Sequence, residues 1–277
     1  SETLGLSTSE REPTLAALVD ALADPPEPTV VGLDVPFSLP AEFLRSSPET
    51  ETVASGDDPD DSGGSDASDE LDASGASDDS TGSDDTTTTG GDWTRFVRET
   101  PDSWGRLDDV SDPKSLYERV RDVADAAGVP RSRATDEQYG GQEPAGFRIR
   151  TQTFYGISAL LAPLVEREAV RVPPLHQDPD ASVTVLETYP AAVFDALPRG
   201  VREGYKSDDR AGVAARERNR AALAAAGVEL GGTDASCATA TDDALDAVAA
   251  AFAARRDAAA AVGGSYSPRE RSEGVVF

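Results

Sequence analysis

Four acidic residues, at the ends of two apolar runs and the start of one helix-like segment, carry most of the chemical information in this chain. Asp34 ends the run VVGLD, Glu187 ends VTVLE, and Asp243 and Asp246 open the alanine-rich segment TDDALDAVAAAF. Carboxylate oxygens are the ligands that Mg²⁺ and Mn²⁺ take in proteins. Because the chain has only one histidine and one cysteine, these residue types favour a hard divalent ion over zinc.

The spacing of the acids supports hydrolytic chemistry. Asp243 and Asp246 are three residues apart, so on a helix their side chains share a face, about 5–6 Å from each other. Clustered carboxylates repel one another unless a cation neutralises them or one of them keeps a proton. Two ions roughly 3.5–4 Å apart can activate water and stabilise the leaving oxygen in phosphodiester hydrolysis.

Each acid also has a structural explanation. An acidic residue in the first turn of a helix stabilises it by up to about 1 kcal/mol, which would account for Asp243. Asp34 could cap the turn before Pro36, and Glu187 could be a solvated strand end. Asp246 lies deeper in its helix, where the helix dipole explains it less well. The combination is therefore more specific than any single member.

Six basic residues are candidates for binding a phosphate group: Arg148, Arg150, Lys206, Arg210, Arg216 and Arg220. Arg216 and Arg220 are four residues apart and share one helix face. Arginine stays charged and binds phosphate through two parallel hydrogen bonds. The alternative is ordinary ion pairing at the surface of a chain with 52 acidic residues.

The chain is strongly acidic, with 52 Asp and Glu against 25 Lys and Arg and a net charge of −27. Lysine and isoleucine each occur only twice, and methionine is absent. This composition resembles that of halophilic archaeal proteins, in which dense carboxylates keep the surface hydrated. An acidic protein from an ordinary cytoplasm is the alternative. At molar salt the Debye length is only about 3 Å, so net charge neither supports nor excludes a nucleic-acid partner.

Composition excludes several classes of function. The single cysteine, Cys237, rules out an internal disulfide and a cysteine-rich zinc site. His176 has no nucleophile motif beside it, and no GxxxxGK phosphate-binding loop occurs. No apolar run approaches the roughly 18 residues of a membrane span, and no signal peptide is visible. We therefore expect a cytoplasmic protein without a membrane partner.

Residues 46–92 form a block of Ser, Asp, Gly and Thr without any basic residue. Its few apolar side chains cannot offset the entropy that ordering the segment would cost, so we predict a disordered acidic insert. The remaining residues suit one α/β domain. The expected organisation is one domain over residues 1–277, interrupted by this insert, and the pattern does not indicate an oligomeric state.

Helical segments alternating with buried strands predict an α/β fold. The strands are expected at residues 29–34 and 182–187, where β-branched apolar runs are typical of parallel sheets. Residues 274–277 could add an edge strand. The main helices are expected at residues 12–22, 93–99, 111–127, 190–197, 211–226 and 241–262. Ligands collect at the carboxyl ends of parallel strands, where Asp34 and Glu187 stand.

The chain resembles a family of predicted nucleases known as domain of unknown function 429. The resemblance rests on four stretches in this order: VVGLDVPFSLP; RATDEQYGGQEPAGFRIRTQTFYGISALLAPL; VLETYPAAVFDAL with the following GYK; and TDDALDAVAAAF. The segment DALDAVA also resembles the last helix of Holliday-junction resolvases, where two aspartates three apart hold metal. The resemblance implies an RNase H-like mixed sheet flanked by helices, with a helical insertion between the fourth and fifth strands.

The resemblance also implies roles for the acids. Asp34 becomes the acid of the fourth strand, Asp243 and Asp246 become metal ligands on the last helix, and Glu187 becomes a fifth-strand acid that assists. The family opens with a strand that carries a G-x-D aspartate, and nothing before Asp34 matches it. We therefore expect the first strand or strands to be missing from the chain as given, which begins at Ser1.

Three further residues, Arg133, Asp136 and Gln152, lie in the matching stretches without an implied role. The resulting hypothesis is a metal-dependent nuclease that hydrolyses DNA or RNA by a two-metal mechanism. Its metal ligands would be Asp34, Asp243 and Asp246, with Glu187 as a further catalytic acid. The competing hypothesis is a catalytically incomplete RNase H-like module that binds a nucleotide, a nucleic acid or a protein partner.

Overall fold

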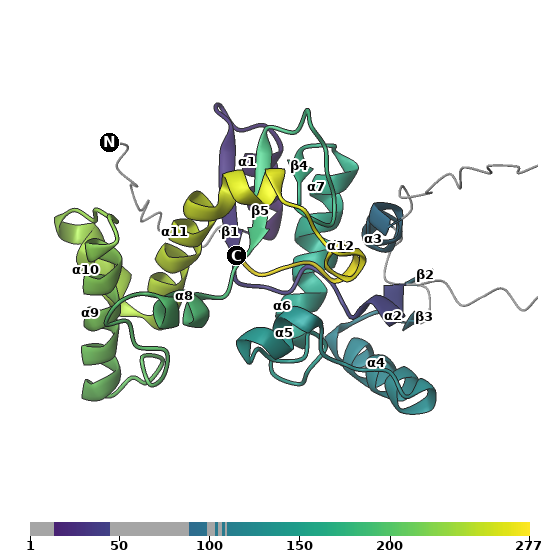
Figure 1. Cartoon of the computed structure of the whole chain (residues 1–277), viewed down its shortest axis with the longest axis horizontal. Coiled ribbons are helices and arrows are strands. Elements are labelled where there is room, and N and C mark those ends of the chain that lie inside the picture. The colour runs from purple at the N-terminus through teal and green to yellow at the C-terminus, as the bar shows by residue number, and fades with distance from the viewer. Residues whose placement is uncertain (1–13, 45–88, 99–102, 105–106, 109) are drawn as a thin grey trace, which may run out of the picture.

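The computed structural model of the chain describes residues 14–44, 89–98, 103–104, 107–108 and 110–277. This part is a mixed α/β structure in which helices flank a small parallel sheet (Figure 1). The α/β class and both strands expected from the sequence are confirmed.

The sheet contains β1 (Thr29–Leu33), β4 (Val170–Arg171) and β5 (Val183–Glu187), with β5 in the centre. The pairing of β1 with β5 runs from Thr29 opposite Val183 to Leu33 opposite Glu187. All five residues of β5 are buried, as expected for a strand covered on both faces.

Strand alternation sends the side chains of β5 into two different cores. Val183 and Val185 belong to the large core, whereas Leu186 packs with Ala254 and Ala261 on the other face of the sheet. Because side chains alternate with a period of two, the residues at the carboxyl ends of β1 and β5 are also divided between the two faces.

Helix α11 (Asp242–Gly263) lies directly across β1 at Gly32. A β-carbon built on Gly32 would lie 2.2 Å from the backbone oxygen of Ala250 and 3.1 Å from the Ala254 side chain. Since backbone atoms cannot yield as a flexible side chain can, only glycine permits this close approach. The alanine-rich face of α11 serves the same close packing.

The close approach also brings the acids of α11 to the end of β1. Asp34 lies two residues beyond Gly32 and, by strand alternation, extends from the same face. Asp246 lies four residues before Ala250, one turn away on the same helix face. The step from Gly32 to Asp34 along the strand and the step from Ala250 back to Asp246 along the helix each cover about 6 Å. The rise is roughly 3.3 Å per strand residue and 1.5 Å per helix residue. The two carboxylates therefore approach each other.

The opposite face of the sheet is covered by helices. Helix α1 (Leu15–Ala23) precedes β1, and the elements between β1 and β4 are α2 (Ala41–Leu44), α3 (Thr89–Arg98), α4 (Pro113–Ala127), α5 (Ala134–Tyr139), α6 (Arg150–Tyr155), the π-helical turn η1 (Gly156–Leu161) and α7 (Ala162–Glu166). A short antiparallel pair, β2 (Ser103–Trp104) and β3 (Leu107–Asp108), lies among them. Phe37, Trp93 and Leu161 are fully buried in this large core.

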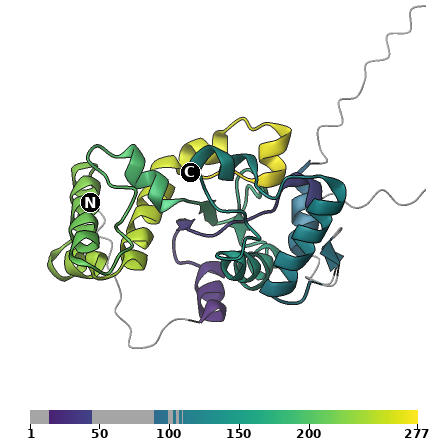
Figure 2. The same ribbon diagram turned by 90° about the horizontal axis from the view of Figure 1, so that it is seen from below.

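A second core lies beside the outer side of α11. Helices α8 (Pro190–Ala196), α9 (Arg210–Ala225) and α10 (Gly232–Ala240) pack there around Phe194, Leu223 and Leu245. Figures 1 and 2 show these helices gathered at one end of the molecule, away from α4. None of the described helices combines the length and apolar character that a membrane crossing requires.

Several details differ from the sequence predictions. Residues 274–277 form no strand, although the Phe277 amide donates to the Glu187 carbonyl at 3.0 Å. Asp112, not Ser111, caps α4, since its carboxylate accepts from the amide of Lys114 at 2.7 Å. The described pairings of the three-stranded sheet are all parallel rather than mixed.

The acidic block predicted for residues 46–92 lies mostly outside the described residues, which resume at Thr89. Helix α3 begins at that residue, so residues 89–92 are helical and do not belong to a disordered insert. The structure describes nothing before residue 14, so the expectation of a missing first strand stays a prediction.

The contact at Gly32 predicts that Gly32→Ala destabilises the fold. The added methyl group must push the α11 backbone off β1, and overpacking of this kind costs about 1–3 kcal/mol. Chemical denaturation in molar KCl measures the loss. Gly263→Ala in the same helix is the matched control, because its β-carbon would meet no atom within 4 Å. If both variants were equally stable, the close approach of α11 to β1 would not require glycine at position 32.

Candidate active site

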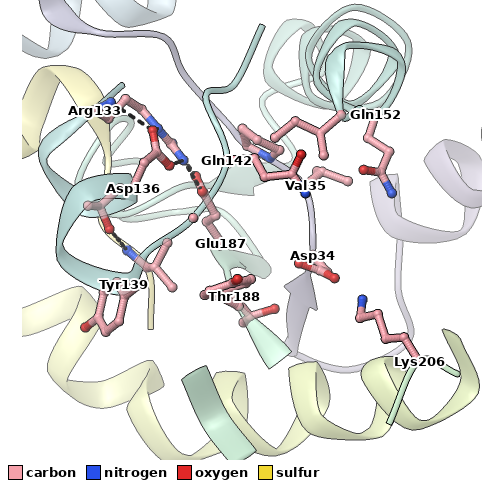
Figure 3. Close-up of a pocket in the computed structure, with 16 residues that line it drawn as sticks. Asp34, Val35, Arg133, Asp136, Tyr139, Gln142, Gln152, Glu187, Thr188 and Lys206 are labelled. Atoms are coloured by element: carbon pink, nitrogen blue, oxygen red, sulfur yellow. Dashed lines mark hydrogen bonds and ion pairs between the residues drawn. The ribbon is translucent and has the colours of Figure 1, made fainter. Parts of the chain in front are cut away.

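Asp34 directly follows β1 and faces the open side of the site (Figure 3). The pKa of its carboxyl is raised from 3.8 to about 6. Desolvation by the surrounding protein is the largest cause, followed by the negative charge of Asp246, and Lys206 opposes the shift. Among the described residues, none donates a hydrogen bond to this carboxylate. Asp34 is therefore an exposed acid in a negative field, without a bonded partner.

Asp246 is buried and held by two donors from the segment between α8 and α9. The Tyr205 hydroxyl donates to its Oδ1 at 2.9 Å, and Lys206 Nζ donates to its Oδ2 at 2.8 Å. Burial and the negative charge of Asp246 raise the pKa of the Tyr205 hydroxyl, which keeps it a donor. Burial acts to lower the pKa of Lys206, but the bond to Asp246 outweighs it and the pKa rises. Lys206 is thus a cation bound to Asp246 and close to Asp34.

Asp243 lies one turn before Asp246 and is exposed. Its charge is the smallest of the contributions that raise the pKa of Asp34, whereas that of Asp246 is the largest among the charges. That Asp34, Asp243 and Asp246 together hold one ion stays a prediction. The first turn of α11 is also where an acid complements the helix dipole. The position of Asp243 therefore suits both explanations proposed from the sequence, the metal ligand and the helix-dipole partner.

Glu187 is the centre of a buried cluster of ion pairs. In the sheet it is paired with Leu33, so alternation directs it to the other face, although its charge also raises the pKa of Asp34, by more than that of Asp243. There its carboxylate accepts from both terminal nitrogens of Arg133, at 2.6 and 2.8 Å, and from the Phe37 amide at 2.9 Å. The suggestion of a solvated strand end is wrong, since only 5% of Glu187 is exposed.

Arg133 joins this buried cluster to the chain end. Its guanidinium also donates to both Asp136 oxygens, at 2.8 and 3.1 Å, and to the Glu273 carbonyl at 3.3 Å. Burial acts to lower the pKa of Arg133, but the two carboxylates outweigh it and raise the pKa. The Glu273 carboxylate in turn accepts from the amides of Ala41 and Ala134, at 3.1 and 2.8 Å. One buried cation thus holds four separate segments together.

Sequence reasoning assigned no role to Arg133 and Asp136 and did not single out Tyr205 or Thr188. The spacing of Arg133 and Asp136, three apart at the start of a short helix, is a detectable sign, since the Asp136 carboxylate accepts from the Arg133 amide at 2.8 Å. Thr188 has no comparable sign in the sequence. Its position opposite Asp34 follows only from the register of β1 and β5.

Of the six basic residues proposed to grip phosphate, Lys206 lines the site. Arg148 and Arg210 are exposed. Arg150 stacks over the Phe147 ring at 4.5 Å, and Arg220 pairs with Glu217 at 3.0 Å, as the surface-pairing alternative expected.

The proposed phosphate-binding role of Arg216 needs correction. Its guanidinium is buried and donates to the carbonyls of Tyr205 at 2.8 Å, Ser207 at 2.9 Å and Thr239 at 3.2 Å. It therefore shapes the loop that carries Lys206 and does not face a substrate.

A cavity of about 150 Å³ opens beside Asp34. Its walls come from the residues after β1 and β5, from α5, from α6 and from the 205–206 loop, as Figure 3 shows. Glu187 and Arg133 form part of one wall, and Lys206 lies at the other side. The two acidic clusters, one neutralised and one open, thus border the same space.

The open cluster offers only oxygen ligands. Asp34 lacks a bonded partner, Asp243 is exposed, and each Asp246 oxygen keeps a lone pair beyond its one hydrogen bond. This donor set suits Mg²⁺ or Mn²⁺. Within the described ranges, no three acidic, histidine or cysteine side chains stand ready as a metal cluster. The positive charge at Asp246 comes from Lys206.

Comparison with known proteins links most of this site to one family. Residues 113–270 match the model of the family described as "Protein of unknown function (DUF429)". The match covers more than half of the chain. It includes Arg133, Glu187, Lys206, Asp243 and Asp246, and it begins after Asp34. No curated protein and no solved structure matches significantly.

The Arg133 cluster predicts a large loss of stability in Arg133→Met. Removing the guanidinium leaves the buried carboxylates of Glu187 and Asp136 without a counter-charge, which costs about 3–5 kcal/mol. Urea denaturation measures this loss. Arg121→Met is the control, because Arg121 forms an exposed pair with Asp122 that is worth at most about 1 kcal/mol. Similar losses in both variants would contradict the structural role of Arg133.

The raised pKa of Asp34 predicts a pH-dependent gain of stability in Asp34→Asn. Between pH 3.8 and about 6 the unfolded chain loses the Asp34 proton before the folded chain does, so rising pH destabilises the parent. We expect the variant and the parent to have the same melting temperature at pH 3.5, and the variant to have the higher melting temperature at pH 7.5, as measured by thermal unfolding. Asp209→Asn should behave oppositely, because hydrogen bonding from Gly212 lowers the pKa of Asp209. A pH-independent difference for Asp34→Asn would refute the shift.

Proposed function

Since the chain belongs to the DUF429 family, whose description gives no function, we propose from its site that it is a metal-dependent hydrolase of phosphodiester bonds in nucleic acid. One observation carries the proposal: Asp34, without a bonded partner, lies close to Asp243 and Asp246 at the carboxyl end of a parallel strand. Ligands of α/β proteins collect at such strand ends. A negative site with free oxygens favours a divalent cation and, through it, a phosphate group.

The fold assignment within this proposal is an RNase H-like domain. It is supported by parallel β1 and β5, by an acid at the end of β1 and by two aspartates three apart on the long helix α11 across the sheet. The separation of Glu187 from these acids gives it a supporting role. It positions the strand end by holding Arg133 and the Phe37 amide.

Asp34, Asp243 and Asp246 would hold the ion. When bound, Mg²⁺ or Mn²⁺ supplies a Lewis acid and lowers the pKa of a water. Below about pH 6 Asp34 keeps its proton, so its carboxylate becomes available to a cation near neutrality. Tyr205 and Lys206 fix Asp246 through one hydrogen bond on each oxygen.

Lys206 has a second task in this proposal. About half of its side chain is exposed, and it lines the cavity beside Asp34. An ammonium group there would meet the phosphate that is being cleaved and offset its charge next to the acids. The exposed Arg148 and Arg210 would contact phosphates further away. The net charge of −27 supports a salt-rich cytoplasm as the setting, where screening permits such an approach.

The proposal is tested by cleavage of labelled single-stranded and structured DNA and RNA in molar KCl with Mn²⁺. We expect cleavage that Asp34→Asn and Asp243→Asn each reduce at least about a hundredfold, since both remove an ion ligand. Asp125→Asn, at an exposed carboxylate on α4, is the matched control. Variants that unfold are recognised from their circular dichroism.

Three results would decide against the nuclease. Parental cleavage by both site variants would refute the site assignment. Cleavage that persists in excess chelator would refute the metal requirement. Binding of nucleic acid without cleavage under any divalent ion would favour the alternative, a binding module.

A further inference from the structure

The cavity beside Asp34 has room for one ring. Its volume of about 150 Å³ equals that of an engineered protein cavity that binds benzene, about 150 Å³. A six-membered ring fits such a space. The chain of a nucleic acid would then lie outside it, over Asp34 and Lys206.

The walls suit the flat faces of an aromatic ring. Apolar or aromatic side chains line the cavity from five segments: Val35, Pro36, Tyr139, Ile149, Tyr189 and Val276. Arg202 ties the two tyrosine-bearing segments together, since it donates to the Tyr139 carbonyl and lies 5.6 Å from the centre of the Tyr189 ring. Aromatic and apolar walls of this kind bind bases by stacking.

Unpaired neutral polar groups occur at the same cavity. The carboxamides of Gln142 and Gln152 line it above Asp34 (Figure 3), and no described residue is hydrogen-bonded to either. A carboxamide offers a donor and an acceptor side by side, which matches the edge of a base. The Thr188 hydroxyl is buried without a partner among the described residues. Thr188 is itself one of the residues that line the cavity.

On one side of the cavity, the charged groups Arg133, Glu187 and Asp136 are occupied by one another, whereas Asp34 and Lys206 lie at the other side. Arg133 is bonded to Glu187 and Asp136 at 2.6 to 3.1 Å, so it has little left to offer an anion. Away from Asp34 and Lys206, the cavity therefore presents neutral donors and acceptors, two of them on the exposed side chains of Gln142 and Gln152, between apolar walls. This combination fits a heterocyclic base better than a phosphate, a carboxylate or a plain hydrocarbon.

We propose that this cavity binds one nucleobase of pyrimidine size, adjacent to the place where the proposed ion of Asp34 and the Lys206 ammonium would hold a phosphate. The adjacency to a cleaved phosphate rests on the proposed function, whereas the base pocket does not. A base reaches such a cavity only when it is out of the helical stack. The substrate class is accordingly an unpaired nucleotide in a single strand, a loop or a chain end.

The test compares two ligands that differ only by the base. Isothermal titration calorimetry in molar KCl measures the affinity of the parent for uridine 5′-monophosphate and for ribose 5-phosphate. We expect the nucleotide to bind at least about tenfold more tightly, as stacking and edge contacts of one base imply. Equal affinities, or no measurable binding of either ligand, would overturn the proposal.

Two variants assign the effect to the cavity. Gln142→Leu should lower the affinity for uridine 5′-monophosphate several-fold and leave that for ribose 5-phosphate unchanged. Gln177→Leu, at an exposed glutamine outside the cavity, should change neither. Equal effects of the two variants would overturn the location. Base-selective binding without any cleavage would sink the proposed function alone, and cleavage without base selectivity would sink the pocket alone.

Discussion

The close contact between α11 and β1 at Gly32 is the constraint on which the site depends. Because no side chain separates the strand from the Ala250 carbonyl, the helix lies against the sheet at the shortest possible distance. Matching steps along strand and helix then bring Asp34 next to Asp246, and Tyr205 and Lys206 hold the latter in place. A larger side chain at position 32 would displace α11 from β1. Asp34 and Asp246 would then lie too far apart for their charges to act strongly on each other.

The alternation of strand side chains divides the acids into two electrostatic classes. Glu187 falls on the face where Arg133 neutralises it inside the protein, and the resulting cluster holds β5, α5, the residues after β1 and the end of α12 (Pro268–Glu273) together. Asp34 falls on the other face, where Lys206 offsets only part of the negative charge. One cluster stabilises the fold, while the other keeps a charge imbalance that a ligand can relieve.

Much of this could be predicted from local patterns. Apolar β-branched runs predicted β1 and β5, and a spacing of three predicted that Asp243 and Asp246 share a helix face. The errors arose where a residue's partner lies outside its own helix or strand. Arg216 was expected to bind substrate, but its partners are carbonyls of a loop and of α10. Glu187 was grouped with Asp34, and its charge does act on Asp34, but its buried ion pair with Arg133 was not predicted.

By itself, the sequence determined the α/β class, the strands, most helix positions and the oxygen-only character of the candidate ligands, since these follow from periodicity and residue type. Only the tertiary structure decided which acids meet, which of them Arg133 neutralises, and that Thr188 stands opposite Asp34. The reason is physical: pairing register and close packing depend on contacts between residues more than a hundred positions apart, and no local pattern encodes those distances.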